Sequence, residues 1–385
     1  MSARILVAHN AYQQRGGEDS VVDAELALLR MHGHEVLEYT RHNDEVQGMS
    51  RVKLAIQTLW SGKTVEDVTE LLRAHRPDVI HVHNTFPLIS PSLYWAAARM
   101  KVPVVQTLHN FRLHCPQAIY LRDDRICEDC KGRVPWRGVM HKCYRGSASQ
   151  TGVLTASVML HRSLNTYRDK VARYIALNEF CRSKLIEGGL PAERIRVKPN
   201  FIDASDMQNA FCRDGGLYVG RLSNEKGLDV LVKAVGLLGR NPVRLIGGGD
   251  LENVVKSVFG DAYLGYQPLS TITQEMRRSS YLVLPSICYE GFPRTIVEAF
   301  SAGLPVIASR LGSLPEIVEE GRTGLLFEPG SARDLANKIS WAEAHPQEMG
   351  RMGEAAYEEH SRKYTSQKNY EILMEIYDEA ICERI

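Results

Sequence analysis

The stretch from Tyr281 to Gly303 carries two glutamates whose spacing limits the chemistry they can do. Glu290 stands in a loop after a buried, strand-like run, and Glu298 lies about one turn inside the helix that follows. At helical rise the two are separated by roughly 12 Å, which exceeds the usual spacing of a hydrolytic carboxylate pair. The spacing suits two carboxylates that bind separate sugars, a hexose and a ribose, with phosphates between them. A loop acid followed by a solvated helix acid is the plainer interpretation.

The start of the same helix adds an anion site. Gly291, Phe292 and Pro293 follow Glu290 directly, and proline suits the first turn of a helix. Because the first N–H groups of a helix have no partner inside it, they attract negative charge.

Two cations follow another strand-like run in this half of the chain. Arg221 comes directly after residues 217–220, and Lys226 follows within the same loop. A diphosphate leaving group needs its charge neutralised, and many enzymes hold a divalent ion with an Asp-x-Asp triplet for this purpose. The sequence contains no such triplet, so we expect Arg221 and Lys226 to do the work of the ion.

Four of the eight cysteines fall within 115–143. They are Cys115, Cys127, Cys130 and Cys143. This spacing, with its central Cys-x2-Cys pair, suits tetrahedral zinc, and the surrounding stretch offers little apolar surface to fold around. We predict a structural zinc ion, for which His114 or His141 could replace one thiolate. Unligated thiols are the main alternative, and disulfides are disfavoured in a cytosolic chain.

Short apolar runs alternate with helical patterns throughout, as in βα units and parallel sheets. In the first half we expect strands at residues 4–9, 78–83, 102–109, 174–177 and 195–198. A turn at Gly16-Gly17 follows the first strand and leads into an amphipathic helix that ends near Gly33.

The regular pattern lapses between 201 and 216, where we place a linker, and a second series then begins. We expect its strands at residues 217–220, 243–246, 263–264, 281–284, 305–308 and 324–327. The series predicts an α/β protein with two doubly wound, Rossmann-like domains facing across a cleft, whose ligands sit at the carboxyl ends of strands. We assign 1–200 to the first domain, with a cysteine-rich insert at 110–146, and 201–365 to the second. The final helix, 366–385, is expected to pack back onto the first domain.

These motifs together resemble the retaining glycosyltransferases of family 4, which have the GT-B fold. The resemblance rests on Gly220-Arg221 with Lys226-Gly227, the turn Gly247-Gly248-Gly249-Asp250, Glu290 with Glu298, and Gly312 with Pro315-Glu316, in that order. In the first half, Gly16-Gly17 and the His109 that ends Gln106-Thr107-Leu108-His109 agree with it. Ser313 departs from the pattern, because a second glycine is common there, and this weakens that turn as a phosphate contact.

The resemblance implies a role for each motif. Arg221 and Lys226 would bind the diphosphate, and Glu298 the ribose. Glu290 and the backbone after it would hold the donor hexose, with His109 beside the sugar. We therefore assign catalytic roles to His109, Arg221, Lys226 and Glu290, and donor-binding roles to Gly16, Gly17, Gly220, Gly248, Tyr266, Gly291, Phe292, Pro293 and Glu298. His9, His81 and His83 also end strands and are expected to be structural.

The net charge of +1 conceals an asymmetry. Residues 1–200 hold 28 Lys+Arg against 20 Asp+Glu, residues 201–385 hold 19 against 26, and 131–198 alone hold 14 against 4. A basic first half suggests an anionic partner, for which a membrane face or lipid phosphate is preferred to nucleic acid; solvated surface is the alternative.

Composition and the apolar runs give the expected location. Hydrophobic residues make up 44% of the chain and charged residues 24%, as in soluble globular proteins. The first apolar run is too short for a signal peptide, and no run is long enough to span a membrane. We expect a cytoplasmic protein, with peripheral contact at the inner membrane face as an extension.

The expected activity is the transfer of a hexose from a nucleoside diphosphate sugar to a hydroxyl of a glycan or lipid-linked acceptor, with retention and without a catalytic metal. UDP-glucose or a close relative is the first choice of donor and GDP-mannose the second. A nucleotide-sugar epimerase of related fold would need no acceptor, and a non-catalytic nucleotide-sugar binding protein would never hydrolyse its ligand. Both are alternatives.

Overall fold

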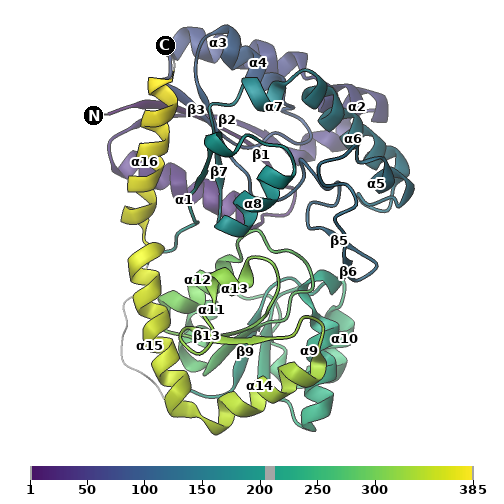
Figure 1. The fold of residues 1–385 in the computed structure, drawn as a ribbon, viewed down its shortest axis with the longest axis vertical. Coiled ribbons are helices and arrows are strands. Elements are labelled where there is room, and N and C mark those ends of the chain that lie inside the picture. The colour runs from purple at the N-terminus through teal and green to yellow at the C-terminus, as the bar shows by residue number, and fades with distance from the viewer. Residues whose placement is uncertain (1, 204–212, 384–385) are drawn as a thin grey trace. The chain divides into compact units, whose positions relative to one another are not determined.

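A computed structural model describes residues 2–203 and 213–383, so the expected linker at 201–216 lies in part outside the described residues. The chain divides into two compact units (Figure 1). The first comprises Met1–Ile119, Glu128–Pro199 and Asn369–Ile385, and the second comprises Tyr120–Cys127 and Asn200–Lys368.

The first unit is built on a parallel six-stranded sheet of order β2-β1-β3-β4-β7-β8. Its strands are β1 (Arg4–Ala11), β2 (Glu35–His42), β3 (Val79–Asn84), β4 (Val104–Thr107), β7 (Arg173–Ala176) and β8 (Ile195–Val197). Its helices are α1 (Gly17–Met31), η1 (Asn43–Gly48), α2 (Arg51–Leu59), α3 (Gly62–His75), α4 (Ser92–Arg99), α5 (Trp136–Met140), α6 (Ala148–Ser163), α7 (Thr166–Asp169), α8 (Glu179–Glu187), η2 (Ala192–Arg194) and, from Asn369 onward, α16 (Ser366–Cys382). Since the chain passes from β1 to β2 and then crosses to β3, the strand order reverses between β1 and β3.

Helices α1 and α16 share one hydrophobic core with this sheet (Figure 1). The core residues include Val22, Leu26 and Leu29 of α1, Leu373, Ile376 and Tyr377 of α16, and Ile5, Val7, Val79, Val105 and Ile175 of the strands. The last helix is thereby held against the first sheet by buried apolar surface, which is the dominant favourable term in packing.

The second unit is built on a parallel five-stranded sheet of order β10-β9-β11-β12-β13. Its strands are β9 (Gly216–Val219), β10 (Val243–Ile246), β11 (Tyr281–Leu284), β12 (Val306–Ser309) and β13 (Gly324–Phe327). Its helices are η3 (Asn224–Lys226), α9 (Leu228–Leu238), α10 (Glu252–Phe259), η4 (Gly260–Ala262), α11 (Leu269–Arg278), α12 (Arg294–Ser301), α13 (Leu314–Ile317), α14 (Ala332–Ala344) and α15 (Pro346–Lys363), and a small antiparallel hairpin joins β5 (Leu121–Arg122) to β6 (Arg125–Ile126). Here the strand order reverses between β9 and β11.

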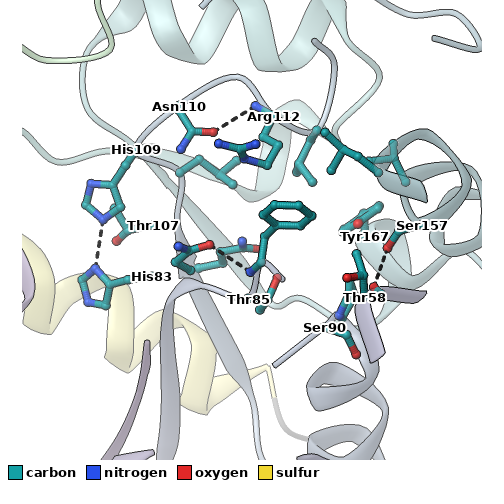
Figure 2. Close-up of a pocket in the computed structure, with 18 of the residues that line it drawn as sticks. Thr58, His83, Thr85, Ser90, Thr107, His109, Asn110, Arg112, Ser157 and Tyr167 are labelled. Atoms are coloured by element: carbon teal, nitrogen blue, oxygen red, sulfur yellow. Dashed lines mark hydrogen bonds between the residues drawn. The ribbon is translucent and has the colours of Figure 1, made fainter. Parts of the chain in front are cut away.

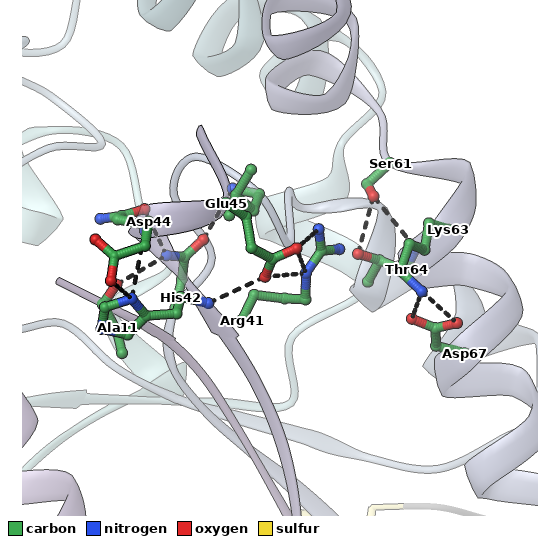
Figure 3. Close-up of polar contacts among 12 residues, drawn as sticks. Ala11, Arg41, His42, Asp44, Glu45, Ser61, Lys63, Thr64 and Asp67 are labelled. Carbon is green, nitrogen blue, oxygen red and sulfur yellow. Dashed lines mark hydrogen bonds and ion pairs between the residues drawn. The ribbon is translucent and has the colours of Figure 1, made fainter. Parts of the chain in front are cut away.

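Three sequence predictions differ from the structure. The insert expected at 110–146 of the first domain is divided, because Tyr120–Cys127 belong to the second unit. The strand expected at 263–264 was wrong, since Tyr263 forms an isolated bridge with Leu245. Strand β2 was missed because it lies at the sheet edge, where polar side chains interrupt the apolar pattern. Its last residues pair with the helix that follows: the Arg41 guanidinium donates to Glu45, and the His42 backbone N–H donates to the same carboxylate at 3.2 Å (Figure 3).

Candidate active site

The candidate donor residues gather where the order of the second sheet reverses. The loop after β9 carries Arg221 and Lys226, and the loop after β11 carries Glu290. In doubly wound sheets, ligands bind outside the carboxyl ends of strands at such a reversal. The topology thus brings together two motifs that lie far apart in the sequence, with 64 residues from Lys226 to Glu290.

Lys226 and Glu290 form a half-buried ion pair. The Lys226 Nζ donates to both carboxylate oxygens of Glu290, at 2.7 and 3.0 Å. Burial opposes both charges, but each partner stabilises the other, so the pKa of Glu290 is lowered and that of Lys226 is raised. Ser286 Oγ donates to the same carboxylate at 2.6 Å. Glu290 is therefore held as an ionised acceptor, ready for a hydroxyl donor.

Close backbone approaches fix these two loops against each other. The Ile287 N–H donates to the Glu225 carbonyl at 3.0 Å. Gly227 has φ +72°, and a Cβ there would lie 1.8 Å from the Pro285 carbonyl oxygen. No larger residue fits that contact, so Gly227 is required by packing as well as by its left-handed backbone.

The glycine turn after β10 packs on the loop after β9 in the same way. Gly247 and Gly249 have φ +144° and +151°, and a Cβ at either would collide with the backbone of Gly220 or Leu222. Gly248, between them, has open space around its Cα. The turn can thus bring backbone close to a ligand, as expected for a donor-binding role of Gly220 and Gly248.

Arg221 does not join the Lys226–Glu290 pair. Its guanidinium lies 2.8 Å from Glu225, and 68% of the side chain is exposed. The side chain can therefore turn toward an incoming anion at little cost, because an exposed ion pair is worth less than about 1 kcal/mol.

The helix after Glu290 begins as the sequence predicts. Pro293 is the N-cap of α12, and no side chain caps the helix there. Phe292 is buried against Tyr364, with ring centroids 5.8 Å apart, so it anchors the loop rather than exposing its ring. Glu298 lies inside α12 with its carboxylate 3.7 Å from Arg294, and burial raises its pKa.

The structure gives two further motif residues clear environments. Ser313, where the family pattern favours glycine, is buried and donates from Oγ to the Glu290 carbonyl at 2.8 Å. This hydroxyl supports the Glu290 loop from the neighbouring turn. Tyr266, which was assigned a donor-binding role, is 87% exposed, so its ring contacts little of the protein.

In the first unit, His109 lies at the edge of a cavity of about 60 Å³ (Figure 2). The ends of β3 and β4, the loops after them and residues of α2, α6 and α7 line the cavity. The lining includes His83, Asn84, Phe86, His109 and Arg112. His109 Nε2 lies 3.0 Å from His83 Nδ1. Burial lowers the pKa of His109 to about 3, so its ring is neutral near pH 7.

Arg112 was missed at the sequence level. Its guanidinium stacks over the rings of Phe86 and Tyr144, at 5.0 and 5.4 Å from their centroids. Its Nη1 is buried and has no hydrogen-bond partner among the described residues. An unpaired buried donor is costly, so this nitrogen is suited to an oxygen of a bound ligand.

Gly16 and Gly17 start α1 beside the same strand ends. The Gly16 N–H donates to Asp19 at 2.7 Å, and His9 Nε2 contacts that carboxylate at 2.9 Å. Burial would raise the pKa of Asp19, but these hydrogen bonds lower it. Glu18, which lines the cavity, is different: burial raises its pKa to about 7 despite the Tyr12 hydroxyl at 3.1 Å.

The cysteine-rich segment is folded by short turns. Cys115 and Cys130 are buried, and Cys127 and Cys143 are half-buried. The Cys127 N–H donates to the Tyr120 carbonyl across the β5–β6 hairpin, and the Cys143 N–H donates to the Gly138 carbonyl after α5. The structure places no disulfide among the cysteines that it describes.

His83, Glu25 and Lys198 are polar residues that no sequence pattern brings together. All three are buried in the first unit. The one available signal was Glu25, a carboxylate in the middle of the apolar face of α1.

In the part of the chain that the structure describes, no helix has both the length and the apolar composition needed to cross a bilayer.

Comparisons with known proteins agree with this geometry. Residues 15–206 match the model of Glycosyltransferase Family 4, and residues 216–359 match that of Glycosyl transferases group 1. An uncharacterised glycosyltransferase of Methanocaldococcus jannaschii is 34% identical over 52% of this chain and 58% of its own. The amylovoran biosynthesis glycosyltransferase AmsK of Erwinia amylovora is 30% identical over 47% of this chain and 51% of its own. The chain thus spans about half the length of the curated relatives it matches.

Solved structures match over nearly the whole chain. Sucrose-phosphate synthase from Thermosynechococcus elongatus superposes with a TM-score of 0.74 at 18% identity, covering 99% of this chain and 100% of its own. HepE of Anabaena, solved with UDP-glucose, gives a TM-score of 0.67 at 20% identity, covering 98% and 100%. At such identities the likeness shows the fold, and the family matches show the lineage. The chain belongs to the family 4 glycosyltransferases and has the GT-B fold.

Proposed function

We propose that the protein transfers a hexose from a nucleoside diphosphate sugar to a hydroxyl of a glycan or lipid-linked acceptor, with retention of configuration. The observation that carries this proposal is the Lys226–Glu290 pair at the reversal point of the second sheet. A cation for the leaving diphosphate and an ionised acceptor for sugar hydroxyls lie together where such sheets bind ligands.

The proposed step breaks the bond from the sugar C1 to the diphosphate and forms a bond from C1 to the acceptor oxygen on the same face. The acceptor proton passes to the departing diphosphate oxygen. Lys226, Arg221 and the start of α12 stabilise the charge that develops on the diphosphate. Glu290 is already engaged by Lys226 and Ser286, which suits it to hold sugar hydroxyls rather than to attack C1. No divalent ion is required in this scheme.

A UDP-hexose is the preferred donor. HepE, which has the same fold, has been solved with UDP, with UDP and glucose, and with UDP-glucose. AmsK is named for amylovoran biosynthesis. These relatives support UDP-glucose or a close UDP-hexose, and glycan synthesis as the setting.

The cavity of the first unit is the proposed acceptor side. Arg112 offers an unpaired N–H, and Glu18, with its pKa raised to about 7, is a carboxyl that can donate or accept near neutral pH. Such groups suit the hydroxyls of a sugar acceptor.

Donor turnover with and without acceptor tests the proposal. UDP and UDP-hexoses should raise the melting temperature, since a ligand at a hundred times its Kd adds about 2.7 kcal/mol of stability. UDP release from UDP-glucose should rise when a cell-derived lipid-linked glycan is added. Thermal stabilisation by no nucleotide at all would reject the proposal.

We also propose that the first unit contacts an anionic membrane at the inner face. Helices α2 and α5 both pack on α6 (Figure 1) and expose apolar side chains. Val52, Ile56, Trp136 and Met140 are 70%, 62%, 53% and 67% exposed. Lysines and arginines are their neighbours in the sequence, and those beside Trp136 and Met140 belong to the basic stretch 131–198. Apolar side chains ringed by cations suit the headgroup region of anionic lipid.

Aspartate in place of Ile56 and Met140 should weaken binding to phosphatidylserine-containing vesicles about tenfold or more, because charge replaces inserted apolar surface. Cosedimentation measures it, with Leu237→Asp, an equally exposed position of the second unit, as the control. Unchanged binding by the double variant would exclude this surface.

A structural zinc ion bound by Cys115, Cys127, Cys130 and Cys143 stays part of the proposal. Cys115 and Cys130 are buried and Cys127 and Cys143 are half-buried. Among the described residues, however, only Glu25, His81 and His83 place three metal-ligand atoms within 4.8 Å of one another, so the zinc proposal rests on the sequence spacing. Zinc at the cysteines would stabilise the fold of a segment that has few apolar residues of its own. Four protein ligands leave no open coordination position for substrate.

Elemental analysis should find about one zinc per chain, and Cys127→Ser/Cys130→Ser should abolish it. Because metal binding and local folding are coupled, proteolysis of the variant should begin within 115–143. The exposed Cys382 gives a matched control, Cys382→Ser, with full zinc content. Metal-free protein whose segment resists protease would contradict the prediction.

A further inference from the structure

A chain of buried polar contacts in the first unit begins at His109 and leads away from the cavity. His109 Nε2 lies 3.0 Å from His83 Nδ1 (Figure 2). His83 Nε2 lies 3.5 Å from Glu25 Oε2, and the other carboxylate oxygen of Glu25 pairs with Lys198. His83, Glu25 and Lys198 are all nearly inaccessible to solvent.

The charge of each group in the chain can be assigned. Burial opposes the ionisation of Glu25, but the Lys198 ammonium outweighs it and lowers the pKa, so the carboxylate is ionised. Burial lowers the pKa of His83 well below its ordinary value, and that of His109 to about 3. Both rings are therefore neutral near pH 7, and each carries one proton.

The position of each proton follows from the ionised carboxylate, which can only accept hydrogen bonds. Glu25 Oε2 and His83 Nε2 lie 3.5 Å apart, and neither has a hydrogen-bond partner among the described residues. His81 Nδ1, 3.7 Å from the same oxygen, already contacts the Tyr377 hydroxyl. A proton on His83 Nε2, facing Glu25, is therefore the arrangement that satisfies the carboxylate. His83 Nδ1 is then an acceptor, and His109 must donate to it from Nε2. The remaining nitrogen of His109, Nδ1, carries a lone pair.

A metal site is the competing interpretation. Ligand atoms of Glu25, His81 and His83 lie within 4.8 Å of one another. However, the Lys198 ammonium already contacts the Glu25 carboxylate, and the Tyr377 hydroxyl lies 2.7 Å from His81 Nδ1. A second cation beside a buried ammonium is unfavourable, so the geometry favours hydrogen bonding over ligation.

We propose that Glu25 is a positioning residue: through His83 it sets the tautomer of His109, so that Nδ1 presents a lone pair to a hydroxyl group of the substrate. The substrate part rests on the proposed function. It implies a neutral sugar hydroxyl at this point, since a carboxylate or phosphate oxygen there would face a lone pair.

Glu25→Gln is the most informative variant, because it should reverse the direction of each hydrogen bond between residue 25, His83 and His109. The Lys198 ammonium can only donate, so the carbonyl oxygen of the introduced amide must face it. The NH₂ group of that amide then faces His83 Nε2 and makes it an acceptor. His83 Nδ1 becomes a donor, His109 Nε2 becomes an acceptor, and the His109 proton moves to Nδ1.

Adding Lys198→Met lets the introduced amide turn again. With the ammonium gone, the amide carbonyl can face His83 and restore the wild-type tautomer. The double variant also removes both charges of a buried pair together, which proteins commonly tolerate better than the loss of one. It therefore serves as the rescue and protects the test against a single variant that fails to fold.

Nitrogen-15 NMR of histidine-labelled protein reads the tautomer directly, with the His109 signal assigned from His109→Gln. We expect protonated Nε2 in the wild type and the double variant, and protonated Nδ1 in Glu25→Gln. Tyr377→Phe is the matched control: it removes a buried hydroxyl from His81 but leaves the His83–His109 contact untouched. A His109 protonated on Nδ1 in the wild type, or unchanged in Glu25→Gln, would overturn the proposal.

Kinetics tests the substrate part separately. Glu25→Gln should lower kcat for UDP-hexose turnover about 10- to 100-fold, because a donor replaces an acceptor opposite the hydroxyl. The double variant should recover most of the lost kcat, and UDP affinity should stay within about threefold of the wild type in all variants.

Because the NMR experiment needs no substrate, its result is valid even if the protein transfers no sugar. Bound metal that shifts the His83 signals of purified protein would show ligation instead and overturn the tautomer assignment.

Discussion

Lys226→Ala is expected to slow sugar transfer about a hundredfold or more. Loss of one preorganised charge partner of a developing anion costs that much when nothing replaces it. Arg221→Ala should have an effect of similar size, although its side chain is exposed and paired with Glu225 in the absence of ligand. Steady-state rates of UDP release, with Lys233→Ala as a surface control, measure both. Full activity in the double variant, or strict dependence on added magnesium, would refute the assignment.

Unfolding of the Lys226 variant must be separated from loss of catalysis, because Glu290 would lose its ion pair. In the wild type the pKa of Glu290 is lowered, so the pair contributes stability above the carboxyl's unfolded pKa, and this is lost as pH falls through the folded value. In the Lys226 variant the effect of burial, which raises the pKa of Glu290, is no longer offset by the ammonium, so this pKa should rise. The stability difference between the two proteins should therefore shrink on acidification, as melting temperatures between about pH 7 and pH 4 would show. A slow enzyme that is fully folded at pH 7 locates the defect in the chemistry.

The five strands of the second sheet were each predicted to within one residue at either end. Runs 243–246, 281–284 and 324–327 coincide with β10, β11 and β13, and every residue of the last two is buried. A parallel strand whose residues are all covered is apolar throughout, so its limits are clear in the sequence even at the edge of the sheet, as in β13. Strand β2 was not read because its edge position lets solvent reach alternate side chains.

The site was predictable as a set of motifs but not as a set of contacts. Strand-end positions predicted that Lys226 and Glu290 would both lie at the carboxyl edge of the second sheet, yet their pairing depends on the reversal between β9 and β11, which the sequence does not state. The contacts from Glu25 through His83 to His109 could not be predicted from the sequence for the same reason, because α1, β3 and the end of β4 meet only in the folded unit. Arg112, which follows β4 closely, could not be singled out from the sequence. What makes it a candidate is a buried Nη1 without a hydrogen-bond partner among the described residues, and only the structure shows this.

Glu298→Ala should weaken UDP binding about 10- to 100-fold. A carboxylate that accepts hydrogen bonds from the two ribose hydroxyls contributes roughly 1.5–3 kcal/mol to the binding free energy. Its position supports this: only 19% of the side chain is exposed inside α12, and burial raises its pKa, so an incoming pair of donors meets a carboxylate with little competing hydration. Titration calorimetry with UDP measures the loss. Glu343→Ala in α14 is the control in the same unit, because its carboxylate pairs with the exposed Arg240 and belongs to none of the donor motifs.

Glu290→Ala should have the opposite signature, with turnover reduced about a hundredfold and UDP affinity within about threefold of the wild type. Lys226 donates to both oxygens of Glu290, so removing the carboxylate releases the ammonium for the diphosphate and offsets any loss of contact. The donor hexose, which UDP lacks, is the part that would no longer be held. UDP-glucose should therefore bind more weakly relative to UDP than in the wild type. Equal losses of UDP affinity in the Glu290 and Glu298 variants would contradict the division of the site into a sugar end and a ribose end.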